Sequence, residues 1–280
     1  MFLQPELITK NIPPFSNDKI LLKTRIDFYK SNNLKYITTE YKDFISAFEN
    51  SIEKNQSVKI LGLDKFLFKD VIIGCQHFLD NLIMEYGLHN LQFFEGGYGY
   101  FKKLNKNLQY TTLKNLQSGK PLLLEYPFPR YQSEHPQYKE IIQTCNEKNI
   151  DVYLDCAWLP VSFGLELDLN QPCIKGLAMS LSKCYGLHWN RIGVRWYKNE
   201  KKDSIFLQNE NRMISYSNLM IGKFYLDRLP IDYLVKKYKN KYIDICKKFD
   251  LLPGNTISVA RSKDEQKLYS LKNSLLHKED

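Results

Sequence analysis

Short runs of aliphatic and β-branched residues alternate along the chain with stretches whose apolar residues recur every three or four positions. The first pattern is typical of buried strands, and the second is typical of helices with one apolar face. The strand-like runs are VKILGL, DVIIG, LQFF, PLLLE, DVYLDC, IKGLAMS and IGVRWY. Helical periodicity is found within residues 41–52, 78–86 and 138–145. This alternation, from about residue 57 to 197, predicts an α/β fold: a mostly parallel sheet with helices on both faces.

The chain beyond this region follows a different pattern. Residues 214–250 form a long amphipathic stretch that is interrupted at Pro230, and GNTISVARS after it is a possible strand. We therefore expect an N-terminal segment over residues 1–56, a large domain over 57–200 and a short C-terminal α+β region over 201–280.

Composition and charge narrow the class of protein without naming a partner. The 280 residues, 43% hydrophobic and 25% charged, are enough for a sizeable globular core. The net charge of +9 is spread over scattered lysines, which favours solvated helix faces over a nucleic-acid groove. No apolar run reaches the roughly 20 residues of a membrane helix, and the start of the chain lacks a signal-peptide pattern. We expect no membrane segment and a cytoplasmic location.

The cysteines and histidines show no metal-ligand spacing. Six cysteines are scattered without a CxxC motif, so we expect free thiols. The five histidines are equally dispersed, and His77 is expected near the start of a helix rather than at a metal. The sequence therefore predicts no metal site.

Polar residues at the ends of the predicted strands form one chemically coherent set. In open α/β sheets, ligands bind beyond the carboxyl ends of the strands. Asp155 ends the run DVYLD, where a single carboxylate is often only a cap. Lys183 follows IKGLAMS, directly after Ser180 and Ser182, and Arg191 comes eight residues later. This combination of an aspartate, an amine, two hydroxyls and a guanidinium matches the needs of pyridoxal phosphate.

Each part of pyridoxal phosphate has a candidate residue. Its aldehyde condenses with a lysine amine, and a carboxylate keeps its ring nitrogen protonated, which are roles for Lys183 and Asp155. Its phosphate favours hydroxyls, a guanidinium and the free N–H groups of a helix start. The candidates for the phosphate are Ser180, Ser182, Arg191 and the strand-to-helix turn Gly74, Cys75 and Gln76.

The segment SLSKCYGLHWNRIG resembles the motif of the fold-type I pyridoxal-phosphate-dependent enzymes, of the class I/II aminotransferase kind. In that family Ser-x-Ser-Lys is followed by an arginine eight residues after the lysine, as Arg191 follows Lys183 here. The family's Asp-x-Ala-Tyr stands here as residues 155–158, Asp-Cys-Ala-Trp. The resemblance implies that Ala157 lies under the cofactor ring and that Tyr98, in FFEGGYGYFKKL, stacks on the other face.

Three features depart from the family pattern. Pro127 or Phe128 stands where the family usually has an asparagine, and Trp158 stands where it has a tyrosine. Both family residues hydrogen-bond the phenolic oxygen of the cofactor, and the indole N–H of Trp158 replaces one of these donors. The C-terminal region is also shorter than in the family. Arg25 or Arg261 is the candidate for binding a substrate carboxylate, and a surface position is the alternative for Arg261.

The resemblance implies a pyridoxal-phosphate-dependent aminotransferase. Such an enzyme moves an amino group between an amino acid or amine and a carbonyl acceptor, through a Schiff base on Lys183. It also implies a homodimer. The alternative is a shortened relative that catalyses decarboxylation or β-elimination, or one that only binds its ligand.

Overall fold

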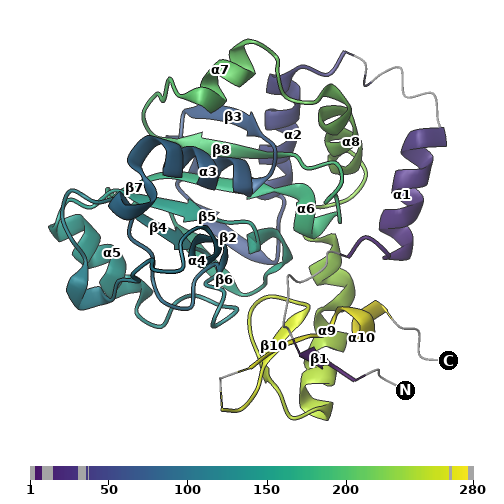
Figure 1. Ribbon diagram of the computed structural model, residues 1–280. Helices are drawn as coiled ribbons and strands as arrows, with labels where there is room; N and C mark the ends of the chain where they lie inside the picture. Colours follow the sequence, from purple (N-terminus) through teal and green to yellow (C-terminus); the bar gives the residue numbers. More distant parts are fainter. Residues whose placement is uncertain (1–3, 8–14, 31–35, 37, 265–266, 277–280) are drawn as a thin grey trace.

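The computed structural model describes residues 4–7, 15–30, 36, 38–264 and 267–276, and a five-stranded sheet lies at its centre (Figure 1). In spatial order its strands are β3 (Phe68–Ile72), β8 (Gly193–Tyr197), β7 (Ile174–Ser180), β5 (Val152–Asp155) and β4 (Leu122–Glu125). Strands β4, β5 and β7 are parallel, and β8 is antiparallel to both of its neighbours. All strands except β8 therefore point the same way, which confirms the predicted mostly parallel sheet.

Helices cover both faces of this sheet, as predicted. Helices α3 (Cys75–Tyr86) and α4 (Tyr100–Leu104) share an apolar cluster with one face. Helices α2 (Tyr41–Glu53), α5 (Tyr138–Glu147) and α8 (Tyr216–Leu226) share the core on the other face. Because successive side chains of a strand point to opposite faces, neighbouring residues of one strand belong to different clusters.

The predicted helices are confirmed with small changes at their ends. The helix predicted over 78–86 begins earlier, at Cys75, directly after Gly74. The stretch 214–250 forms α8 and then α9 (Tyr233–Lys248), with Pro230 between them. Proline has no backbone N–H and cannot continue a helix, so the break falls there. The remaining helices are α1 (Lys19–Lys30), α6 (Leu181–Cys184), α7 (Ser204–Glu210) and α10 (Lys272–Leu276), with short 3-10 turns at Leu63–Lys65, Leu88–Asn90, Leu113–Asn115 and Leu159–Val161.

A small antiparallel sheet packs beside α9 in the lower part of the molecule (Figure 1). Its order is β1 (Glu6–Leu7), β11 (Leu268–Ser270), β10 (Val259–Arg261) and β9 (Leu252–Pro253). The possible strand in GNTISVARS corresponds to β10. A separate parallel pair joins β2 (Val58–Leu61) to β6 (Leu165–Asp168). The predicted boundaries at residues 57 and 200 stay a prediction.

One predicted strand does not form. Residues 91–94, the run LQFF, make only isolated bridges, from Gln92 to Leu122 and from Phe94 to Thr111. Leu91, Phe93 and Phe94 are nevertheless buried. Burial in the core, rather than strand pairing, explains the apolar character of this segment.

All six cysteines are buried free thiols, as expected. None of the helices described for this chain has the length and apolar character that crossing a bilayer requires.

Candidate active site

A pocket of about 130 Å³ lies at the carboxyl ends of β4, β5 and β7. Leu123, Tyr153 and Ala178 point toward α3, so the residues two positions later on each strand point the same way. Those residues are Glu125, Asp155 and Ser180, and all three line the pocket. Every residue predicted to bind the cofactor except Gly74 lines the pocket: Cys75, Gln76, Tyr98, Asp155, Ala157, Trp158, Ser180, Ser182, Lys183 and Arg191.

Lys183 enters the pocket from α6, immediately after β7. Its Nζ lies 4.6 Å from the centroid of the Trp158 ring, a cation–π contact. Burial lowers the pKa of Lys183, the charge of Asp155 opposes that change, and the charge of Arg191 adds to it. A lowered pKa makes more of the neutral amine available at neutral pH, and the neutral amine is the nucleophile.

Asp155 lies at the end of β5 and is 8% exposed. Burial raises its pKa, while the N–H of Ala157, the thiol of Cys75 and the charge of Lys183 oppose this. The Ala157 N–H donates to Asp155 Oδ1 at 3.0 Å. A buried carboxylate of this kind is stabilised by a cationic group placed beside it, such as a protonated ring nitrogen.

The other end of the pocket has the properties of an anion site. Gly74 precedes the first residue of α3 and has a φ of 74°, a left-handed value that favours glycine. A Cβ at this position would lie 3.0 Å from Arg191 Nε, so the missing side chain lets the guanidinium approach the helix start. Ser182 Oγ is buried and has no hydrogen-bond partner among the residues that the structure describes. A helix N-terminus, a guanidinium and an unpaired hydroxyl together fit a phosphate group.

Tyr98 forms an aromatic wall of the pocket. Its ring stacks on Tyr100 with centroids 5.7 Å apart, and burial raises its pKa. Tyr100 is held in turn by Asp80, since its hydroxyl donates to Asp80 Oδ1 at 2.7 Å. Gln76 donates to the same oxygen at 2.9 Å. The wall is therefore tied to α3 through a short polar network.

The sequence reasoning missed Glu125, which also lines the pocket. Glu125 is 6% exposed, and burial raises its pKa to about 7, with the nearby Asp155 charge adding to the change. A signal for it was present, because Glu125 ends the run PLLLE just as Asp155 ends DVYLD. Other lining residues without a prediction are Leu79, Pro129 and His188.

The two candidate carboxylate-binding arginines are absent from the lining of this pocket. Arg25 Nη2 donates to the carbonyl of Gly186 at 2.7 Å. The guanidinium of Arg261 lies 5.8 Å from the centroid of the Tyr131 ring.

Pro127 lines the pocket, whereas Phe128 packs edge-on against His135 with centroids 4.8 Å apart. Pro127, rather than Phe128, therefore faces the ligand space where the family usually has an asparagine.

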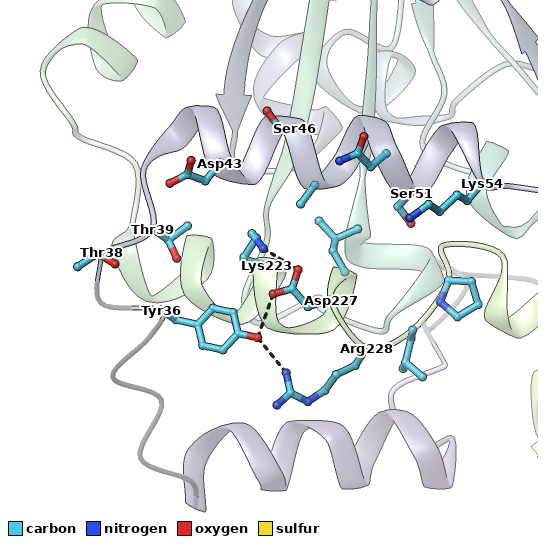
Figure 2. Close-up of a pocket in the computed structure, with 15 residues that line it drawn as sticks. Tyr36, Thr38, Thr39, Asp43, Ser46, Ser51, Lys54, Lys223, Asp227 and Arg228 are labelled. Atoms are coloured by element: carbon cyan, nitrogen blue, oxygen red, sulfur yellow. Dashed lines mark hydrogen bonds and ion pairs between the residues drawn. The ribbon is translucent and has the colours of Figure 1, made fainter.

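A larger hollow, of about 850 Å³, is lined by residues of α2 and α8 (Figure 2). Three of the charged groups that line it, Lys223, Asp227 and Arg228, have polar partners within the hollow. Lys223 Nζ lies 2.6 Å from Asp227 Oδ1, and the Tyr36 hydroxyl donates to Asp227 Oδ2 at 3.0 Å. Arg228 donates to the same hydroxyl at 2.9 Å. None of the predicted site residues lines this hollow, so it is not the candidate site.

Within the described ranges, no group of three or more His, Cys, Asp or Glu side chains could hold a metal ion.

The sequence matches no known family model, and no curated protein is similar to it. Solved structures, in contrast, share its fold. Alanine aminotransferase from Pyrococcus furiosus aligns with a TM-score of 0.62 over 91% of this chain and 76% of its own, at 13% identity. This chain has the fold of the fold-type I pyridoxal-phosphate-dependent enzymes.

Two further structures extend this likeness. Cystalysin from Treponema denticola, whose structure contains a pyridoxal 5'-phosphate cofactor, gives a TM-score of 0.63 at 12% identity, covering 93% of this chain and 75% of that one. L-threonine-O-3-phosphate decarboxylase from Porphyromonas gingivalis gives 0.54 at 13% identity, covering 87% and 82%. An aminotransferase and a decarboxylase thus share this fold, so the fold alone does not select a reaction.

Proposed function

We propose that this protein binds pyridoxal 5'-phosphate in the pocket at the ends of β4, β5 and β7 and acts as an aminotransferase. It would move an amino group between an amino acid or amine and a carbonyl acceptor. The observation that carries this proposal is that Lys183 and Asp155 share one pocket with an anion site built from Arg191, Ser182 and the start of α3.

The residues divide between two ends of the ligand. Arg191, Ser180, Ser182 and the N-terminus of α3 would bind the phosphate, through charge and hydrogen bonds. Asp155, at the opposite end, would hold a proton on the ring nitrogen by its charge. The Tyr98 wall would pack against the ring. An arrangement with cations at one end and carboxylates at the other orients a ligand that is itself charged oppositely at its two ends.

Bound pyridoxal phosphate supplies an electron sink for negative charge at a substrate carbon. Lys183 would bind the cofactor covalently through its amine. Once a substrate amine has taken its place, the free Nζ of Lys183 would accept and return a proton at the substrate α-carbon. Trp158, 4.6 Å from that nitrogen, would restrict where the freed amine can move.

A second candidate function is other carbanion chemistry, such as decarboxylation or β-elimination. Two observations support this second function. Pro127 faces the pocket where the family usually has an asparagine, and neither Arg25 nor Arg261 lines the pocket. The first difference affects hydrogen bonding to the cofactor, and the second affects how a substrate carboxylate would be held. A relative that only binds its ligand would have the same pocket but no turnover.

Two measurements test the proposal. Borohydride reduction of the loaded protein, followed by peptide mass mapping, should place the pyridoxyl group on Lys183, and a label on another lysine would refute the assignment. Incubation with a panel of amino acids should then convert the yellow protein to its colourless aminated form with release of a keto acid. Release of carbon dioxide or ammonia instead would establish the second candidate, and Lys183→Ala should abolish either reaction.

We further propose that the protein is a homodimer with the site near the subunit interface. Trp189, directly after the pocket-lining His188, is 79% exposed. Aromatic side chains are enriched at protein interfaces, and Trp189 lies beside a pocket residue in the sequence, which supports an interface near the site.

A further inference from the structure

We propose that Glu125 is a further functional group of this pocket: one carboxyl oxygen fixes the Tyr98 wall, and the other donates a hydrogen bond to the bound cofactor when it carries a proton. This inference rests on the proposed function, because it assigns Glu125 a role toward the same cofactor. It adds a group that the resemblance to the family does not imply.

The position of Glu125 follows from the sheet. Glu125 is the register partner of Asp155 across β4 and β5, and both side chains point to the α3 face at the carboxyl ends of their strands. Asp155 in turn pairs with Ala178 on β7, which precedes Ser180 by two residues. Glu125 therefore belongs to the same row of strand-end residues as the two groups already assigned to the cofactor.

The first oxygen of Glu125 holds the backbone beneath the aromatic wall. The Tyr98 N–H donates to Glu125 Oε1 at 2.6 Å. A Cβ at the preceding residue, Gly97, would lie 2.9 Å from Oε2 and 3.0 Å from Oε1, so glycine is needed for the carboxyl group to come this close. Glu125 thus positions Tyr98 through the main chain rather than through its ring.

The second carboxyl oxygen of Glu125, Oε2, is available to a ligand in the pocket. Apart from the N–H of Glu125 itself, which interacts with its own carboxyl group, no other group in the described residues donates a hydrogen bond to Oε2, and the side chain lines the ligand space. Two residues later, Pro127 also lines that space but has no N–H and no polar side chain. A protonated carboxyl group has one O–H donor, so Glu125 can supply a donor on the strand whose end lacks the family asparagine.

The charges around Glu125 favour a proton on it. Burial and the negative charge of Asp155, which faces Glu125 from β5, both raise the pKa of Glu125, and the net value is about 7. The N–H groups of Tyr98 and of Glu125 itself oppose this change. Tyr110 lies near enough that the charge of Glu125 raises its pKa as well. Within the described residues no lysine or arginine forms an ion pair with Glu125.

The test uses the full chain loaded with pyridoxal phosphate and reads the absorption spectrum of the bound cofactor as a function of pH. Glu125→Gln keeps an acceptor for the Tyr98 N–H and a donor for the pocket but cannot titrate. Glu125→Leu has a similar volume and removes both functions. Glu53→Gln, at the exposed end of α2, is the matched control.

The wild-type spectrum should show a transition near pH 7 that is missing in Glu125→Gln and kept in Glu53→Gln. In Glu125→Leu the main spectral midpoint should move by about one pH unit, a tenfold change in proton affinity. If the Glu125→Gln and wild-type curves coincide, the inference is overturned even when Glu125→Leu fails to fold. A wild-type chain that takes up no cofactor would overturn the proposed function as well, whereas labelling of Lys183 with coincident curves overturns only the role of Glu125.

Discussion

Replacing Glu125 by glutamine should stabilise the cofactor-free protein at high pH. Burial raises the pKa of Glu125 from 4.5 to about 7, so between these values the folded chain keeps a proton that the unfolded chain has lost. The folded state binds more protons in this window, and its stability therefore falls as the pH rises through it. The loss is complete above about pH 7 and absent below the unfolded pKa.

The size of the effect follows from the two pKa values. A difference of roughly 2.5 units, at about 1.36 kcal/mol for each unit, corresponds to about 3 kcal/mol. The whole pKa difference is converted to free energy because Glu125 is only 6% exposed and its charge is not screened by solvent. Asp155, whose pKa is also raised by burial, contributes to the pH dependence of both proteins. Its interaction with the Glu125 charge exists only in the wild type and is already part of the raised pKa of Glu125, so it belongs to the difference between the two proteins.

The assay is urea unfolding of the cofactor-free wild type and Glu125→Gln at a series of pH values from about 4 to about 8. The difference in unfolding free energy, variant minus wild type, should rise by about 3 kcal/mol across this range. Glu53→Gln should stay within about 0.5 kcal/mol of the wild type at every pH, as expected for an exposed side chain. A difference for Glu125→Gln that does not change with pH would refute the reasoning, since it would mean that Glu125 is charged in the folded protein at pH 5.

Four further outcomes are expected. Asp155→Asn should leave the fold nearly intact and lower kcat by about 10- to 1000-fold, because loss of a neighbouring charge lowers the ring-nitrogen pKa by roughly one to three units; near-normal turnover would contradict this. Arg191→Ala should weaken cofactor binding by about 10- to 100-fold through loss of a charge-assisted contact of roughly 1.5–3 kcal/mol, measured by equilibrium dialysis. Sedimentation at micromolar concentration should show a dimer, and a monomer would refute that proposal. Because neither Arg25 nor Arg261 lines the pocket, kcat/KM should favour an amino acid over its decarboxylated amine by less than about 100-fold, equal to about 2.7 kcal/mol. A larger preference that disappears in Arg25→Ala or Arg261→Ala would identify the missing carboxylate clamp.

The sequence predicted the sheet because strands buried on both faces have near-continuous apolar runs, and β4, β5 and β7 all have them. The same signal failed for residues 91–94, where Phe93 and Phe94 are buried without a strand ladder. Apolar character reports burial, and pairing depends on neighbours that a single sequence does not reveal.

The pocket lining was predictable where family spacing and strand ends coincide, as they do for Asp155 and Lys183. Glu125 was not predicted, although it lies at a strand end, because it belongs to no motif of the family. The burial and raised pKa of Glu125 also depend on Gly97 and Tyr98, which contact its carboxyl group at the end of β4. Residue spacing in the sequence does not reveal such contacts. Likewise, nothing in the sequence distinguishes an arginine that lines a pocket from Arg25, which donates to a main-chain carbonyl.

The pairing of β1 with β11 has a consequence for the order of assembly. Glu6 lies opposite Ser270, so this contact joins segments from near opposite ends of the sequence. During synthesis β11 leaves the ribosome after nearly all other elements. The hydrogen bonds between β1 and β11 can form only after that point. The central sheet, whose strands all lie between Phe68 and Tyr197, can form before then. The small sheet should therefore close last, and contacts that span so much of the sequence are slow to form because the ends of a long flexible loop must first meet.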